Sequence, residues 1–260
     1  MSNNFYERQF DSTFDRDGEI ECAKVLIIAS TGRSGSHMLG HLMQQSGGLG
    51  VPFEYFNQAN MKRWMGLWGV SRMDDYVAVL KRKRVDANGV LTIKIHYHQL
   101  LDLGGYSFIE KYFSSAKLIH MFRENQIMQA VSFSRAIQDG VWIDGQKTMG
   151  SASYNYRLIY NSMRHIEESC LGWRMLAVEK DLPLLEVSME SILRDPEAWL
   201  RLIYLYLDEA VPADVAQVGF STKKQGRGRN REWASRFCRE YGLRGKRLRH
   251  RVLRKLLSLA

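Results

Sequence analysis

A short loop rich in glycine and serine, with one arginine inside it, is the first segment whose composition suggests chemistry. It runs Ser30-Thr-Gly-Arg-Ser-Gly-Ser36 between an apolar run and a helical pattern. Small residues let backbone N–H groups approach an anion, and the following helix adds a positive field at its N-terminus. Arg33 contributes a full charge, and Ser34 and Ser36 contribute hydroxyl donors. The loop predicts a phosphate or sulfate site without the lysine of a Walker A motif; the alternative is an ordinary tight turn.

A second arginine and a serine are spaced so that they can meet one phosphate. Arg123 follows the apolar run 116–122, and Ser132 comes nine residues later in a helical pattern. A guanidinium at a strand end offers a fork of donors, and a hydroxyl in the next helix adds another. The alternative is an arginine that caps the strand end and a serine on a helix flank.

Two histidine pairs have spacings that metal ligands also use. His96 and His98 stand two residues apart, and His37 and His41 stand at helical i, i+4 spacing. Neither pair has a matching set of carboxylates or cysteines, so no metal is expected. If the apolar run before them continues as a strand, Lys94, His96 and His98 share one face and line a cleft together. The alternative is a pair of strand-end histidines with ordinary hydrogen bonds.

The elements that must position these residues alternate along the chain between strand and helix. Four short apolar runs predict buried strands, and the segment 51–57 predicts a further short strand or extended edge. This order predicts an α/β fold with a parallel sheet covered by helices on both faces. The four strands are expected at 24–29, 90–95, 116–122 and 184–187, and the helices at 37–45, 58–84, 126–138, 154–179 and 196–207.

Length and charge limit the class of protein. The chain has 260 residues, 45% of them apolar and 25% charged, which is typical of one globular α/β domain. It carries 37 basic and 28 acidic residues, a net charge of +9, which favours anionic partners such as nucleotides, sulfated sugars, nucleic acid or an acidic membrane face. We expect a polar lead over 1–23, one domain over 24–237 and a basic extension over 238–260.

Cysteine usage and the N-terminal composition indicate the compartment. Cys22, Cys170 and Cys238 are scattered and form no paired motif, which fits a reducing environment. The N-terminal lead is polar and lacks the apolar core of a secretory signal, and no uncharged stretch reads as a membrane span. A cytoplasmic protein is expected.

Four segments, in the same order, resemble PAPS-dependent sulfotransferases, especially the bacterial trehalose 2-sulfotransferase-like group. The segment VLIIASTGRSGSHML at 25–39 resembles the 5′-phosphosulfate loop, and GVPFEYF at 50–56 resembles a Gly-x-Pro-x-Glu-Phe-Phe segment. FRENQIMQAVSFSRA at 122–136 resembles the 3′-phosphate motif, and QGRGRNREW at 225–233 is similar to a C-terminal Glu-Trp segment. The resemblance implies a P-loop-like sulfotransferase fold and PAPS (3′-phosphoadenosine 5′-phosphosulfate) as the donor, with no metal.

The resemblance also implies roles for individual residues. An acceptor hydroxyl would attack sulfur in line, with Arg33 neutralising the bridging oxygen and Glu54 matching the family's base. Lys94-Ile-His96 resembles the Lys-x-His of cytosolic sulfotransferases, which makes His96 a rival base. Glu54, Lys94 and His98 are expected to contact the acceptor. The expected donor-binding residues are Thr31, Gly32, Arg33, Ser34, Gly35, Ser36, His37, Arg123, Ser132, Arg227 and Arg229.

Three positions depart from the trehalose-specific pattern. Thr31 stands where glutamine is usual, His37 where threonine is usual, and Val51 where an acidic residue lies near the sugar. The donor site looks retained, so the acceptor is expected to be a carbohydrate, polysaccharide, lipopolysaccharide or glycolipid, trehalose being only one candidate. Related bacterial enzymes are dimers, so the resemblance also implies a homodimer.

The basic C-terminal segment 236–260 mixes arginines and lysines with leucines and predicts a basic amphipathic helix. Three interpretations stay open: a solvated helix packed by its leucine side, peripheral contact with an anionic membrane, and a dock for anionic acceptors.

Two other function classes compete with sulfuryl transfer. A P-loop nucleotide kinase would need a Walker lysine and a Mg²⁺-binding aspartate, and the sequence has neither pairing. A nucleic-acid-binding module is supported by the charge and would bind polynucleotides with a steep salt dependence. Under the sulfotransferase interpretation no nucleic-acid partner is expected.

Overall fold

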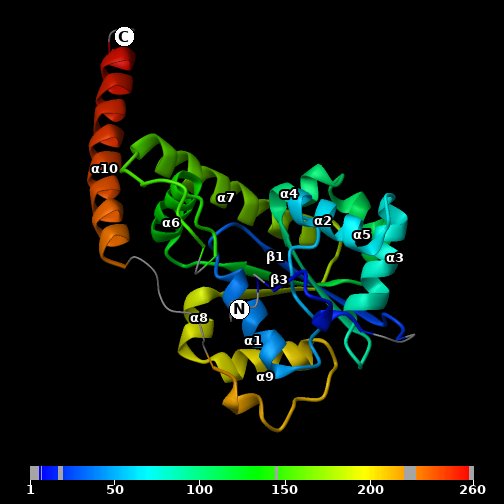
Figure 1. Ribbon diagram of the computed structural model, residues 1–260. Coiled ribbons are helices and arrows are strands. Elements are labelled where there is room, and N and C mark those ends of the chain that lie inside the picture. Colours follow the sequence, from blue (N-terminus) through cyan, green and yellow to red (C-terminus); the bar gives the residue numbers. More distant parts are fainter. Residues whose placement is uncertain (1–5, 7, 17–19, 144–145, 220–226, 258–260) are drawn as a thin grey trace. The chain divides into compact units, whose positions relative to one another are not determined.

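The computed structural model describes residues 6, 8–16, 20–143, 146–219 and 227–257, with the backbone alone for 227 and 244–257 (Figure 1). Contacts divide the chain into two compact units. The first unit comprises Met1–Glu124 and Ile166–Thr222, and the second comprises Asn125–His165 and Lys223–Ala260. The sheet and the predicted loop of glycine and serine belong to the first unit.

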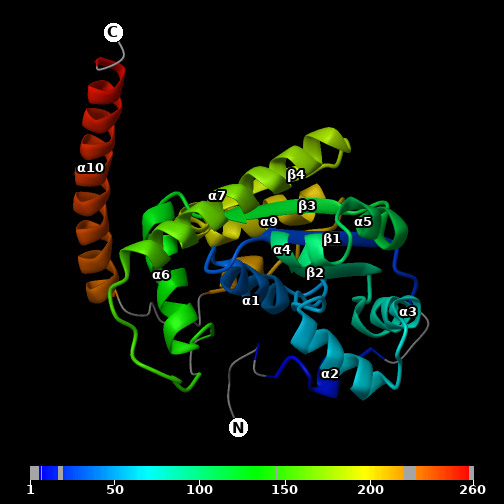
Figure 2. The same cartoon turned by 90° about the horizontal axis from the view of Figure 1, so that it is seen from above.

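The centre of the first unit is a four-stranded parallel sheet with the strand order β2-β1-β3-β4 (Figure 2). Its register places Ile28 of the central strand beside Lys94 on one side and Ile119 on the other. All four predicted strands are confirmed to within one residue, because their β-branched and apolar side chains fill a sheet that is buried on both faces. The strands are β1 (Lys24–Ser30), β2 (Val90–His96), β3 (Lys117–Phe122) and β4 (Leu184–Ser188).

Helices cover one face of this sheet with aliphatic side chains. Leu26 and Ile28 of β1 and Ile119 and Met121 of β3 point into a buried cluster with residues of three helices. These helices are α1 (Ser36–Ser46), α8 (Met189–Arg194) and α9 (Pro196–Tyr206), which lie on the same side of the strands in Figure 1. The first unit also contains the short 3₁₀ helices Ser12–Phe14 and Val215–Gln217.

The opposite face of the sheet is covered by aromatic and polar residues of later helices. The indole of Trp173, fully buried on α7 (Tyr156–Glu179), donates a hydrogen bond to the carbonyl oxygen of Ser30 at 3.1 Å. The helices α4 (Tyr97–Asp102) and α5 (Tyr106–Phe113) lie on this side too (Figure 1). The α/β architecture with helices on both faces is therefore confirmed.

Two predictions about the segment after α1 are confirmed in part. The segment 51–57, expected as a short strand or extended edge, pairs with β2 only through one isolated parallel bridge between Phe53 and Ile93, because Pro52 has no N–H to donate and the chain turns away at Glu54. The helical pattern expected over 58–84 is present, but it is divided into two helices, α2 (Gln58–Trp68) and α3 (Met73–Arg84). Gly69, with φ +66°, ends the first of them in the left-handed conformation.

A correction concerns the predicted cleft-lining strand face. The strand β2 ends at His96, and α4 begins at the next residue. Lys94 and His96 do share a face of β2, whereas His98 lies on the helix, where it is exposed and stacks its ring on that of His96 at 5.8 Å.

The second unit is helical. It contains α6 (Gln126–Asp139), the beginning of α7, and α10 (Arg227–Leu257). Trp233 and Phe237 of α10 are buried, Trp233 against Tyr154 and Phe237 against Tyr156. The predicted boundary between 237 and 238 falls inside α10. None of the helices that the structure describes combines the length and apolarity needed to cross a membrane.

Candidate active site

The loop between β1 and α1 has a backbone that depends on glycine. Arg33 has φ +64° and Gly35 has φ +99°, so both adopt the left-handed region. A Cβ atom at position 35 would also lie 2.7 Å from Cγ of Met189. The loop is tightened by a hydrogen bond from Ser34 N–H to the carbonyl oxygen of Thr31 at 3.3 Å. These features hold Arg33 at the N-terminus of α1, where no side chain of the described residues caps the helix.

Buried donors around this loop fit an anionic ligand. Ser34 Oγ and Arg123 Nε are buried and have no hydrogen-bond partner among the described residues. Burial, and then the charge of Arg33, lower the pKa of Arg123 to about 10, while Glu190 opposes the shift. Arg123 therefore stays charged at neutral pH beside a second guanidinium. Because buried polar groups are almost always paired, these donors are suited to an anion such as phosphate or sulfate, and the predicted anion site stays a prediction.

The topology explains why these two arginines are neighbours. Arg33 follows β1 and Arg123 follows β3, which are adjacent and parallel. The helix that follows β1, α1, lies on one face of the sheet. The helix α7, which precedes β4 in the connection from β3, lies on the other face (Figure 1). Open α/β sheets generally bind their ligands at such a switch point, outside the carboxyl ends of the strands.

A second group of charged side chains converges on the carboxylate of Glu54. Its Oε1 lies 2.7 Å from Lys94 Nζ, 3.2 Å from His37 Nε2 and 3.4 Å from His96 Nε2. Its Oε2 accepts a hydrogen bond from Gln99 at 3.3 Å. The structure thus brings together four of the predicted residues, Glu54, Lys94, His37 and His96, which we call the Glu54 cluster.

The charges of the Glu54 cluster determine its protonation. Burial opposes ionisation of Glu54, yet the charges of Lys94 and His96 and a hydrogen bond from His37 hold its pKa well below the usual value. Burial lowers the pKa of Lys94, and Glu54 opposes that shift. Burial and the charge of Lys94 lower the pKa of His37 to about 4. At neutral pH the cluster therefore holds a carboxylate and a neutral His37.

Sequence reasoning missed the residues that orient this cluster. Gln99 is buried, accepts a hydrogen bond from His96 N–H at 3.0 Å and donates to Glu54. Ser30 Oγ lies 2.9 Å from His96 Nδ1, and the carbonyl oxygen of Ser30 accepts a hydrogen bond from the indole N–H of Trp173. A glutamine three residues after a helix N-cap is a capping pattern, so the sequence contains a signal from which the role of Gln99 could be predicted. The sequence contains no such signal for Trp173.

Several predicted donor-binding residues lie in the second unit. Ser132 lies on the predicted helix, α6, where the structure shows it to be buried, and Arg229 is exposed on α10. The segment similar to the family's C-terminal Glu-Trp segment is helical from Arg227 onward, and the side chain of Arg227 lies outside the described residues. The association of Ser132 and Arg229 with a donor phosphate stays a prediction.

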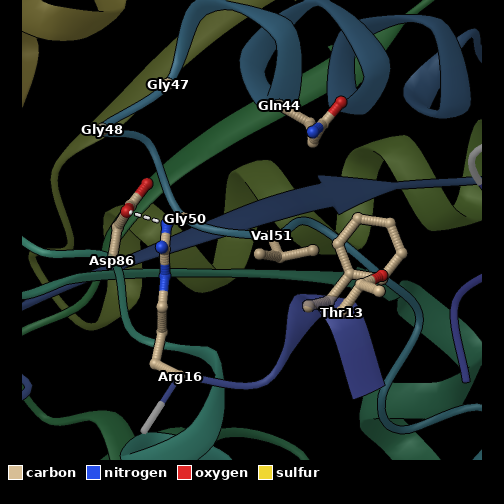
Figure 3. A pocket seen from close by; sticks show the side chains of 9 residues that line it. Thr13, Arg16, Gln44, Gly47, Gly48, Gly50, Val51 and Asp86 are labelled. Atoms are coloured by element: carbon tan, nitrogen blue, oxygen red, sulfur yellow. Dashed lines mark hydrogen bonds and ion pairs between the residues drawn. The ribbon is translucent and has the colours of Figure 1, made fainter. Parts of the chain in front are cut away.

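A cavity of about 220 Å³ lies elsewhere in the first unit (Figure 3). The ion pair between Arg16 and Asp86, with a 2.6 Å separation, spans one end of it. Val51, the position that departs from the trehalose-specific pattern, is among its lining residues. None of the predicted site residues lines this cavity, so it is separate from the candidate active site. Its lining residues are Thr13, Phe14, Arg16, Gln44, Gly47, Gly48, Gly50, Val51 and Asp86.

Solved structures with a similar fold are sulfotransferases. A sulfotransferase from Alicyclobacillus acidocaldarius superimposes with a TM-score of 0.50 and 14% identity over 82% of this chain and 90% of that one. A mouse sulfotransferase complexed with PAP matches with a TM-score of 0.48 and 15% identity, over 84% of this chain and 68% of that one. No curated protein shows a significant match to the chain. The fold is that of the sulfotransferases.

The family follows from the sequence model that matches the chain. The model of the Stf0 sulphotransferase family matches residues 25–93 and 84–240, which include the loop 30–36 and the Glu54 cluster. The chain belongs to the Stf0 sulphotransferase family. This membership assigns a sulfuryl-transfer enzyme and favours that function over the kinase and nucleic-acid-binding alternatives.

Proposed function

We propose that the protein transfers the sulfuryl group of PAPS to a hydroxyl of a carbohydrate or glycolipid, with Glu54 as the base. The observation that supports this most directly is the convergence of Lys94, His37 and His96 on the Glu54 carboxylate. His37, which contacts the Glu54 carboxylate, belongs to the first turn of α1, the helix that follows the loop 30–36, so α1 links the proposed base to the proposed anion site.

The donor would bind at the loop by its 5′-phosphosulfate and near Arg123 by its 3′-phosphate. Backbone N–H groups at the start of α1 and the hydroxyls of Ser34 and Ser36 are suited to the first group. The buried Nε of Arg123 supplies a donor of fixed direction for the second. Two anionic groups would offset the mutual repulsion of Arg33 and Arg123.

In the transfer step the acceptor oxygen forms a bond to sulfur while the bond between sulfur and the bridging phosphate oxygen breaks. The electron pair of the broken bond leaves with adenosine 3′,5′-bisphosphate, and Arg33 neutralises the charge that develops there. The acceptor proton passes to Glu54. A carboxylate of low pKa can accept it, because the acceptor oxygen becomes acidic as its bond to sulfur forms.

Donor binding is tested by titration calorimetry with adenosine 3′,5′-bisphosphate, ATP and a polynucleotide. We expect the bisphosphate to bind tightly, ATP to bind weakly, and the polynucleotide to show only salt-sensitive association. Failure to bind the bisphosphate would exclude the proposed donor.

The identity of the base is tested by comparing Glu54→Gln with His96→Gln, using Glu197→Gln as a matched control. Glu197 forms an exposed i, i+4 ion pair with Arg201 on α9, so this variant makes the same substitution at a surface site. We expect Glu54→Gln to abolish transfer and retain bisphosphate binding. An active Glu54→Gln enzyme and an inactive His96→Gln enzyme would assign the base to His96.

The acceptor is identified by incubating the enzyme with ³⁵S-labelled PAPS and a panel of trehalose, cell-surface polysaccharides, lipopolysaccharide and glycolipids. Label incorporation into a member of the panel would name the acceptor class. Incorporation into none of them, by an enzyme that binds the bisphosphate, would contradict a carbohydrate acceptor.

A further inference from the structure

Tyr6, in the N-terminal lead, is buried against the Glu54 cluster. Only 4% of Tyr6 is exposed, although the lead is polar in sequence. Its ring centroid lies 4.1 Å from that of His37 and 5.6 Å from that of Phe53. Lys94 Nζ lies over the same ring, 4.9 Å from the centroid. One aromatic side chain therefore contacts two members of the cluster and the residue that precedes Glu54.

Tyr6 contacts two members of the cluster, Lys94 and His37, whose environment would change if water reached them. Lys94 is fully buried, so its ammonium group relies on Glu54 and on the π face of Tyr6 for compensation of its charge. His37 keeps part of its side chain exposed, and Tyr6 covers one side of its ring. Removal of the Tyr6 ring would open both groups to solvent and loosen their alignment on the Glu54 oxygen.

We propose that Tyr6 is a positioning residue of the transfer site, which holds Lys94 and His37 against Glu54 and excludes water from this side of the cluster. The inference rests on the proposed function, and it assigns a role in transfer to the lead that precedes the sheet. Tyr6 acts through Lys94 and His37, and no contact with the reacting atoms is required of it.

The helix α1 has a glycine, Gly40, at the position that faces the Tyr6 hydroxyl group. A Cβ atom at Gly40 would overlap the Tyr6 hydroxyl oxygen, while its next contacts, with Pro52, would be at 3.1 and 3.3 Å. Gly40 lies inside the helix, so alanine there would suit the backbone and would act mainly by displacing Tyr6. This gives an independent way to perturb the ring without changing residue 6.

The kinetic test compares Tyr6→Phe, Tyr6→Leu and, as the control, Phe10→Leu. Phe10 belongs to the same lead but packs on Trp64 and under Arg63, neither of which is a member of the cluster. We expect Tyr6→Phe to retain kcat within about twofold, because the ring remains, and Tyr6→Leu to lose about tenfold in kcat with the KM for PAPS unchanged. Phe10→Leu should retain kcat. Equal kcat for Tyr6→Leu and the wild type would overturn the proposal.

The spectroscopic test follows the His37 imidazole by NMR titration and needs no donor or acceptor. The groups that face His37 are Glu54, Lys94, His96 and Tyr6. Because burial is the main cause of its low pKa, the pKa of His37 should rise from about 4 in Tyr6→Ala and stay unchanged in Phe10→Ala. An unchanged His37 titration in a folded Tyr6→Ala protein would refute water exclusion by Tyr6.

A double-mutant cycle separates positioning from general loss of stability. Gly40→Ala should reduce kcat in the wild type and reduce it less in the Tyr6→Phe background, which lacks the oxygen that the new methyl group meets. Equal losses in both backgrounds would contradict the contact. Bisphosphate binding by the wild type is measured in parallel: its absence would exclude the proposed function, while the His37 titration would still test the placement of Tyr6.

Discussion

Removal of the Glu54 carboxylate should destabilise the fold as well as abolish transfer. Lys94 is fully buried, and the Glu54 side chain is 14% exposed, so their 2.7 Å ion pair is shielded from water. Removing one partner of a buried pair leaves an uncompensated charge and typically costs about 3–5 kcal/mol. Because a glutamine side chain would keep the shape of Glu54 and Tyr6 would remain over Lys94, we expect Glu54→Gln to lose about 3 kcal/mol at neutral pH.

The pH dependence of this loss follows from the direction of the Glu54 shift. The pKa of Glu54 in the folded protein lies well below its value of about 4.3 in the unfolded chain, so the unfolded state binds more protons between these values. The stabilising contribution is complete above the unfolded value and is lost as the pH falls through the folded one. The wild type and Glu54→Gln should therefore converge in stability as the solution is acidified.

The assay is urea unfolding followed by tryptophan fluorescence, with the free energy extrapolated to zero denaturant. Lys94→Met and the double variant Glu54→Gln/Lys94→Met complete the cycle, and the double variant should recover most of the stability, because it buries no unpaired charge. The exposed pair gives the control: Glu197→Gln should change stability by less than about 0.5 kcal/mol. A Glu54→Gln protein as stable as the wild type at neutral pH would refute the reasoning.

Three further substitutions test other parts of the structure. Arg123→Lys should weaken bisphosphate binding at least tenfold by calorimetry, because an ammonium group cannot replace the guanidinium fork; unchanged affinity would remove Arg123 from the donor site. Gly35→Ala should lower the unfolding free energy by about 1–3 kcal/mol, because φ is +99° and Met189 blocks the new methyl group, and a neutral result in urea unfolding would contradict the loop conformation. His120 is buried, and burial lowers its pKa in the folded protein. The unfolded state therefore binds more protons than the folded state as the pH falls through the usual pKa of histidine. Acidification from about pH 7 to pH 5 should therefore destabilise the wild type more than His120→Gln, and equal slopes of stability against pH would exclude this contribution.

The sheet was predictable from the sequence, because each strand is a short apolar run with no competing helical periodicity. The segments whose structure differs from the prediction are those in which a local sequence pattern competes with other local signals or with tertiary contacts. Phe53 and Tyr55 have the alternating character of a strand, but Pro52 removes a donor and Phe53 alone pairs with β2. His98 continues the alternation of Lys94 and His96 in sequence. However, Gln99 caps a helix that begins at Tyr97, so His98 lies on that helix and not on the strand.

The candidate site was predictable in its residue types and less so in its arrangement. The motifs identified Glu54, Lys94, His37 and His96 separately, and their convergence on one oxygen required the structure. Gln99 could be found from its capping position. Tyr6 could not, because a single aromatic residue in a polar segment has no periodicity from which burial can be inferred, and its contacts are with residues far along the chain.

The position of β1 at the middle of the sheet has a consequence for synthesis of the protein. Ile28 pairs with Lys94 and Ile119, so β1 leaves the ribosome well before the two strands with which it pairs. Until then the apolar side chains of β1 have no sheet to join, and exposed segments of this kind invite aggregation. The nascent chain should depend on chaperone protection until translation has passed β3, and rapid overexpression should favour inclusion bodies over the native enzyme.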